Sequence, residues 1–276
     1  MRRDPEAVLT AYILDPRRRE LFVEGRRDRL FLLWVVGSDR DPNARIAEID
    51  EVDLPGMAEG GRRGRLLAFA ARVVDDPSAI RFLADADLSR IRDAAVPRNV
   101  WLTDLRDLEG YVFRGECVDK ALTLGAGADG VDASELVSNV SRLARRLAAL
   151  RSLSARTGLK FPFQELDLAR YVSVKRANVE VDFDQVLRVL VQNIGLSLSR
   201  FDDLMNEWTE EEAALKDVPD NQLIHGKDVM CLLSEVLFSH GVSRKDAPKL
   251  VWTSFERRLV GDYPVLVEVV ASLSAA

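Results

Sequence analysis

The sequence contains few of the residues that build disulfide frameworks, zinc sites and histidine-based catalytic centres. Its 276 residues include two cysteines, Cys117 and Cys231, and two histidines, His225 and His240. The cysteines are too few and too far apart for a disulfide framework or a zinc site, so we interpret both as buried thiols. The histidines have no carboxylate or cysteine pattern between them. We therefore expect His225 to cap a helix and His240 to interact with a helix end, and neither to bind metal.

The sequence also lacks long apolar runs and several catalytic motifs. No run approaches the ~20 residues that a membrane-spanning helix needs, so we predict no membrane association. The N-terminal residues lack the apolar segment of a signal peptide, which is typical of a cytoplasmic protein. Walker, dinucleotide-binding and Gly-x-Ser-x-Gly motifs are missing as well. Their absence argues against nucleotide hydrolysis and serine hydrolysis by this chain.

Basic residues are slightly fewer than acidic residues, but many of them occur in clusters. The chain has 39 Lys and Arg residues against 45 Asp and Glu, which gives a net charge of −6. This balance argues against binding of duplex DNA by bulk charge alone, because domains that bind in that way are usually basic. Clusters can still create a local positive face, although solvated helix faces explain each cluster at least as well. The clusters comprise residues 17–19, 26–27 and 62–65, and Arg142, Arg145, Arg146, Arg151 and Arg156.

Short apolar runs alternate with helical patterns over roughly the first 100 residues. We predict strands at 21–23, within 44–54, at 80–84 and at 100–102, and helices at 5–14, 26–36 and 65–74. A chain that alternates in this way forms a mainly parallel sheet with helices on its faces. The predicted fold class is therefore α/β.

The glycine-rich segment 125–130 is the best candidate for a domain boundary. Beyond it, residues 132–135 are typical of a helix cap, and a leucine-rich stripe with helical spacing follows. Further helices are predicted at 184–198, 199–215, 226–239 and 246–259, with short strands at 169–174 and 179–181. We thus predict a first domain over 18–125, an N-terminal helix within 1–17 that packs on it, and a mostly helical second domain over 131–276.

Acidic residues follow two of the predicted strands. Glu24 comes directly after the strand at 21–23, and Asp85 and Asp87 follow the strand at 80–84. Parallel strands would bring these carboxylates to the same edge of the sheet, where open α/β proteins bind ligands. Three convergent carboxylates favour a bound divalent ion such as Mg²⁺. Taken alone, Glu24 has a simpler interpretation as a solvated turn residue. Outer members of an acidic site would be Asp28, Asp104, Asp107 and Glu109.

Three segments resemble the successive motifs of a TOPRIM-like domain. They are Phe22-Val23-Glu24-Gly25-x-x-Asp28, Phe82-Leu83-Ala84-Asp85-Ala86-Asp87 and the segment 102–111. More narrowly, they are similar to a bacterial TOPRIM-like family related to the OLD nucleases. The segment 224–228 and the leucine-rich stretch after it resemble the C-terminal part of that family. The resemblance covers residues 18–125 well and 220–240 weakly.

The resemblance implies metal-dependent phosphodiester chemistry. Glu24 would be the glutamate of the first motif, a metal ligand or general acid/base, and Asp85 and Asp87 would hold Mg²⁺ or Mn²⁺. Asp28 and Glu109 would complete a second metal position or orient its waters. The motifs do not identify the basic residue that neutralises the developing charge. The candidates for that role are Arg26, Arg27, Arg106 and Lys227.

The sequence therefore predicts an enzyme, a Mg²⁺-dependent TOPRIM-type nuclease with Glu24, Asp85 and Asp87 as its catalytic residues. The resemblance also implies a role in antiviral defence beside an ABC-type or AAA-like ATPase. The substrate is left open between DNA and RNA, including tRNA, and so is the formation of a homodimer. The alternative from another functional class is a catalytically silent TOPRIM-like module that binds or regulates a partner ATPase.

Overall fold

The structure is a computed structural model that describes residues 2–54, 60–74, 80–91, 94–175 and 178–275. The chain divides into two compact units. The first comprises Met1–Leu108 and Arg257–Ala276, and the second comprises Glu109–Glu256. The C-terminal segment thus belongs to the same unit as the N-terminal segment. No helix in the described part of the chain is long and apolar enough to cross a membrane.

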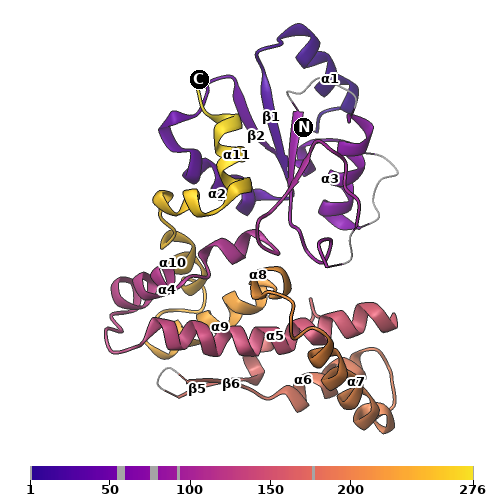
Figure 1. The fold of residues 1–276 in the computed structure, drawn as a ribbon, viewed down its shortest axis with the longest axis vertical. Helices are drawn as coiled ribbons and strands as arrows, with labels where there is room; N and C mark the ends of the chain where they lie inside the picture. Colours follow the sequence, from indigo (N-terminus) through magenta and orange to yellow (C-terminus); the bar gives the residue numbers. More distant parts are fainter. Residues whose placement is uncertain (1, 55–59, 75–79, 92–93, 176–177, 276) are drawn as a thin grey trace. The chain divides into compact units, whose positions relative to one another are not determined.

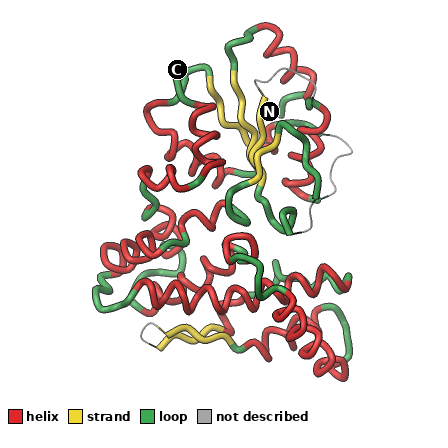
Figure 2. The backbone as a smooth tube through the Cα atoms, viewed as in Figure 1, coloured by secondary structure: helices red, strands yellow, loops and turns green. Residues whose placement is uncertain are grey.

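The first unit contains a four-stranded sheet in the order β2-β1-β3-β4, and each neighbouring pair is parallel. Figure 2 shows these strands as one yellow group. They are β1 (Arg19–Val23), β2 (Ala44–Glu48), β3 (Ile80–Ala84) and β4 (Val100–Leu102). Each of them overlaps a predicted apolar strand, and the α/β class is confirmed.

Helices cover both faces of this sheet (Figure 1). One face carries α1 (Pro5–Leu14) and α3 (Gly61–Arg72), and the other carries α2 (Arg26–Val36) and α11 (Pro264–Leu273). The core under α1 and α3 is centred on three fully buried rings, Phe22, Phe69 and Phe82. Their ring centroids lie 5.3 to 5.6 Å apart. Because Phe22 and Phe82 belong to neighbouring strands, this cluster fixes β1 against β3 just before their carboxyl ends.

The C-terminal helix α11 is held to the sheet by two side chains near the end of β4. The carboxylate of Asp104 accepts hydrogen bonds from the backbone N–H groups of Val265 and Leu266, at 2.9 and 3.2 Å. The indole N–H of Trp101 donates to the Glu268 carboxylate at 3.0 Å. Asp104 therefore caps the first turn of α11, where free N–H groups need acceptors.

The second unit is organised around the long helix α5 (Ala133–Thr157), which contacts α4, α7, α9 and β6. As predicted, the carboxylate of Asp132 caps α5 by accepting hydrogen bonds from the N–H groups of Ser134 and Glu135. The other elements are α4 (Gly115–Lys120), α6 (Phe183–Asn193), α7 (Phe201–Ala214), α8 (Asp220–Leu223), α9 (Gly226–Ser239), α10 (Ala247–Thr253) and the antiparallel hairpin of β5 (Val172–Lys175) and β6 (Asn178–Val181). The predicted cap at His225 is confirmed, because its ring Nδ1 accepts a hydrogen bond from the N–H of Lys227 at the start of α9.

The unit borders differ from the boundary expected at 125–130. Ala121–Ala126 forms a π-helical segment directly after α4, so the chain does not become a linker there. Ala121 and Leu122, before the glycines, line the same small pocket as Leu136, which follows them on α5. Apolar residues on both sides of the glycines thus pack into one core. The glycines turn the chain inside the second unit instead of separating two domains.

Candidate functional site

Glu24 lies at the carboxyl edge of the sheet, between β1 and the N-terminus of α2. Its side-chain Oε1 accepts a hydrogen bond from the backbone N–H of Asp85 at 3.1 Å. Asp85 directly follows β3, the strand that pairs with β1 in parallel. The sequence order predicted this meeting of two acidic residues that lie 61 positions apart.

Asp28 lies in the first turn of α2, close to Glu24. One of its carboxylate oxygens accepts a hydrogen bond from the N–H of Gly25 at 2.8 Å, which completes a capping interaction at the helix N-terminus. A carboxylate at that position is favoured by the helix dipole and by the unpaired N–H groups of the first turn. Asp28 is thus tied to the backbone through one oxygen.

The start of the loop after β3, which carries Asp85 and Asp87, is fixed to the segment 103–108 by hydrogen bonds of residues 85–87. They run from Ala86 N–H to Thr103 Oγ1 at 2.9 Å, from Asp87 N–H to the Arg106 carbonyl at 2.7 Å, and from Leu108 N–H to Asp85 Oδ1 at 3.1 Å. Asp87 adopts the left-handed region with φ of 47°, which aspartate tolerates better than most residues. The loop thus holds its two acidic residues in a defined conformation.

Arg63 is a basic residue at this edge of the sheet that the sequence motifs did not single out. It lies in the first turn of α3, and its Nε donates to the backbone carbonyl of Asp85 at 3.0 Å. The same Nε lies 3.2 Å from Oδ2 of Asp87, and its Nη2 donates to Ser89 Oγ at 2.7 Å. Its side chain is only about one quarter exposed, at 23%. A half-buried guanidinium thus neutralises part of the acidic site.

The pKa of the Glu24 carboxyl is raised from its ordinary value of 4.5 to about 7. Burial is the largest cause, because it disfavours the charged form, and the negative charges of Asp28 and Asp87 act in the same direction. The N–H of Asp85 and the positive charge of Arg63 oppose these effects in part. Glu24 is thus a carboxyl that exchanges its proton near neutral pH.

The donor set at this edge has the right chemistry for a hard divalent ion, because carboxylate oxygens are its preferred ligands. The like charges that raise the pKa of Glu24 are charges that a cation would neutralise. The described residues nevertheless contain no group of three or more Asp, Glu, His or Cys side chains placed to hold one metal ion. In this conformation Asp87 instead faces Arg63, and Asp85 accepts the N–H of Leu108. Ligand roles for Glu24, Asp85 and Asp87 therefore stay predictions.

The remaining sequence candidates are distributed over both units. Asp104, expected as an outer member of the acidic site, caps α11 instead. Glu109 belongs to the second unit, where it is buried in the short 3₁₀ helix Leu108–Val112, and its role as a metal ligand stays a prediction. The exposed Arg26 and Arg27 lie on α2 near Glu24, Arg106 is buried, and Lys227 belongs to the second unit.

A scan of the chain against known protein families and a search of curated proteins both found no significant match. We therefore infer a function from the geometry of the acidic site and from the sequence motifs that surround it.

Proposed function

We propose that the first unit catalyses Mg²⁺-dependent hydrolysis of phosphodiester bonds in nucleic acid, as a TOPRIM-type nuclease. The observation that supports this function best is the Glu24 carboxyl, which is half-buried, accepts a hydrogen bond from the backbone of Asp85 and has a pKa of about 7. A carboxyl with a pKa near neutrality both accepts and donates a proton readily at physiological pH. The resemblance of the motifs around Glu24 and Asp85 to those of TOPRIM-like domains supports the same chemistry.

Each residue of the site has a distinct role in this proposal. Glu24, Asp85 and Asp87 would hold Mg²⁺, and Asp28 would contribute to a second metal position. The ion would activate water and stabilise charge on the phosphate. In the alternative role that the motifs allow, Glu24 would not bind the ion but would act as general acid/base, taking up and returning the proton of the attacking or departing oxygen. Arg63 would release Asp87 and donate to the phosphate, because a guanidinium matches phosphate oxygens in a bidentate manner.

The test is cleavage of labelled DNA and RNA, single-stranded and double-stranded, in Mg²⁺ or Mn²⁺. We expect Glu24→Gln and Asp85→Asn each to reduce cleavage by a factor on the order of 100 or more, since each removes a group that touches the reacting atoms. Glu6→Gln, which removes an exposed carboxylate on α1, is the matched control and should leave cleavage unchanged. Circular dichroism checks that each variant is folded. Unchanged cleavage in either site variant would exclude this function.

A specific observation favours a second candidate function. The ion pair between Arg63 and Asp87 neutralises the acidic site without a metal, as in a TOPRIM-like unit retained for interaction alone. Under this alternative the chain binds or regulates an ABC-type or AAA-like ATPase and has no catalytic role of its own. Titration of the purified chain with Mn²⁺ separates the two candidates. The nuclease binds Mn²⁺ and loses that binding in Glu24→Gln, whereas the silent module binds none in either form.

A further inference from the structure

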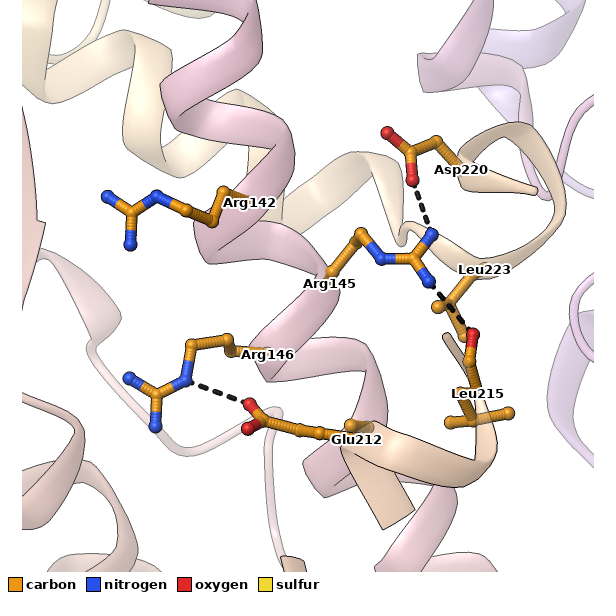
Figure 3. Close-up of a pocket in the computed structure, with 8 residues that line it drawn as sticks. Arg142, Arg145, Arg146, Glu212, Leu215, Asp220 and Leu223 are labelled. Carbon is orange, nitrogen blue, oxygen red and sulfur yellow. Dashed lines mark hydrogen bonds and ion pairs between the residues drawn. The ribbon is translucent and has the colours of Figure 1, made fainter. Parts of the chain in front are cut away.

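A pocket of about 350 Å³ lies in the second unit and is lined by residues that have no part in the acidic site at Glu24 (Figure 3). Three arginines of α5 line it, and two of them, Arg142 and Arg146, are four positions apart and so are neighbours on the helix surface. Apolar side chains and two carboxylates from other elements complete the wall. The lining residues are Arg142, Arg145, Arg146, Ala149, Glu212, Leu215, Asp220 and Leu223.

Arg145 is fixed as part of the wall of the pocket. Its Nη1 donates to the carbonyl of Val218 at 2.8 Å and also pairs with the Asp220 carboxylate. Its Nη2 donates to the carbonyls of Leu215 and Lys216, at 2.8 and 3.1 Å. These contacts engage both terminal nitrogens of Arg145. Arg145 therefore supplies a fixed positive charge to the wall of the pocket, and its terminal nitrogens are not donors for a ligand.

Arg146 is fixed as well, but its terminal nitrogens are not engaged. Its Nε donates to the Glu212 carboxylate at 2.8 Å. Its guanidinium lies 4.1 Å from the ring centroid of Phe183 and 4.8 Å from that of Trp208, which hold its orientation. Within the described part of the chain, Nη1 and Nη2 of Arg146 make no hydrogen bond. They are therefore oriented donors that a ligand can use.

Arg142 is the uncompensated charge of the pocket. Its side chain is exposed and makes no hydrogen bond or ion pair with any residue that the structure describes. Figure 3 shows its side chain and that of Arg146 extending to the same side of α5. Like charges four positions apart on a helix repel each other. The two carboxylates of the pocket already pair with Arg145 and Arg146, so an anion between Arg142 and Arg146 would relieve that repulsion.

We propose that this pocket binds a phosphate group through Arg142 and the terminal nitrogens of Arg146. Guanidinium groups are suited to phosphate because their planar donors reach two oxygens at once. The phosphate can belong to a nucleic-acid backbone or to a free phosphate or mononucleotide, and the same two arginines would bind it in each case. The proposal does not depend on chemistry at Glu24, because all the lining residues belong to the second unit.

The test measures binding without divalent metal, so that cleavage and metal sites make no contribution. In EDTA, inorganic phosphate and AMP are titrated by calorimetry, and a fluorescein-labelled decathymidylate is titrated by fluorescence anisotropy. We compare the wild type with Arg142→Gln and with Arg170→Gln. Arg170 is an exposed arginine of the same unit that pairs with Asp167, and its variant changes the net charge equally.

We expect Arg142→Gln to weaken binding about ten-fold or more, which is the loss of one charge-assisted hydrogen bond. Arg170→Gln should stay within two-fold of the wild type, and Arg142→Lys should retain part of the affinity. Weaker binding of all three probes assigns the pocket to a nucleic-acid backbone. An effect on phosphate and AMP alone assigns it to a free ligand, and both results support a phosphate site. Equal affinities of wild type and Arg142→Gln, or no binding of any probe by the wild type, would overturn the proposal.

Discussion

The carboxylate of Glu24 accepts a hydrogen bond from the backbone N–H of Asp85, and this contact joins the carboxyl ends of two neighbouring parallel strands. A hydrogen bond to the charged form of a carboxyl lowers its pKa. The pKa of Glu24 is nevertheless about 7, because burial and the charges of Asp28 and Asp87 outweigh this bond and Arg63. The proton affinity of Glu24 thus depends on neighbours that can be changed one at a time.

Asp28 allows its charge to be separated from its hydrogen bond. Asp28→Asn removes the charge but keeps an oxygen that can accept the N–H of Gly25, whereas Asp28→Ala removes both. We expect both variants to lower the pKa of Glu24. Asp28→Ala should lower the free energy of unfolding further than Asp28→Asn does, by about 1 kcal/mol for the lost cap. Carboxyl ¹³C NMR titration and urea denaturation measure the two effects. An unchanged Glu24 pKa in Asp28→Asn would show that the charge of Asp28 does not reach Glu24.

Glu24 should also make the stability of the chain depend on pH. A carboxyl whose pKa is higher in the folded state contributes stability that is fully present below its unfolded value and is lost as the pH rises through its folded value. For Glu24 that window runs from 4.5 to about 7. Its contribution to the free energy of unfolding should fall by an amount on the order of 3 kcal/mol across this window.

Glu24→Gln is the comparison that isolates this contribution, since glutamine does not titrate. Urea denaturation at a series of pH values without divalent metal should give a flatter profile for Glu24→Gln than for the wild type between pH 4.5 and 8. Parallel profiles for the two proteins would contradict the raised pKa. Added Mg²⁺ should restore wild-type stability at high pH under the nuclease proposal, because the ion favours the ionised carboxyl.

Much of the sheet and the two acidic strand ends could be predicted from the sequence. Buried parallel strands are nearly continuous apolar runs, so the segments that became β1 and β3 were visible locally. Because the two strands were expected to be parallel, the acidic residues directly after them were expected at the same edge of the sheet. The cap at Asp132 was predictable for a similar reason, because capping depends on residues three positions apart.

Features that depend on contacts between distant segments were not predictable in this way. Asp104 follows a strand closely, as Asp85 does, yet it caps α11. The N–H groups that it accepts lie 161 and 162 positions away in the sequence. Arg63 was visible only as part of a basic cluster. Its helix follows β2 and leads to β3, so its first turn lies at the carboxyl edge of the parallel strands. That rule would have placed Arg63 near Glu24, but not its contacts with Asp85 and Asp87.

The aromatic cluster beneath α3 should control the stability of the first unit. Phe82 is fully buried and lies 5.4 Å from Phe22 and 5.6 Å from Phe69 between ring centroids. We expect Phe82→Ala to lower the free energy of unfolding by about 3–5 kcal/mol through lost burial and a cavity. Phe82→Leu fills most of the space and should cost clearly less. Equal losses for the two variants in urea denaturation would indicate that the ring contacts, and not the buried volume, carry the stability.

Arg63 should compete with a divalent ion for Asp87. Arg63→Gln removes a positive charge, so the net charge of the site around Glu24 becomes more negative. The affinity for Mn²⁺ should therefore rise about ten-fold, which is the effect expected of one unit charge near a protein surface. Cleavage should nevertheless fall by a factor on the order of 100, because Arg63 is the donor proposed to bind the phosphate. Electron paramagnetic resonance of free Mn²⁺ and the cleavage assay measure the two effects.

Arg65→Gln is the matched control for this prediction, because Arg65 lies on the same helix but bonds to Asp50 and the carbonyl of Val52. It removes the same charge and should change neither Mn²⁺ affinity nor cleavage by more than two-fold. Tighter Mn²⁺ binding together with faster cleavage in Arg63→Gln would mean that Arg63 only blocks the site. Mn²⁺ binding in neither protein would favour the silent module, in which Arg63 takes the place of the metal.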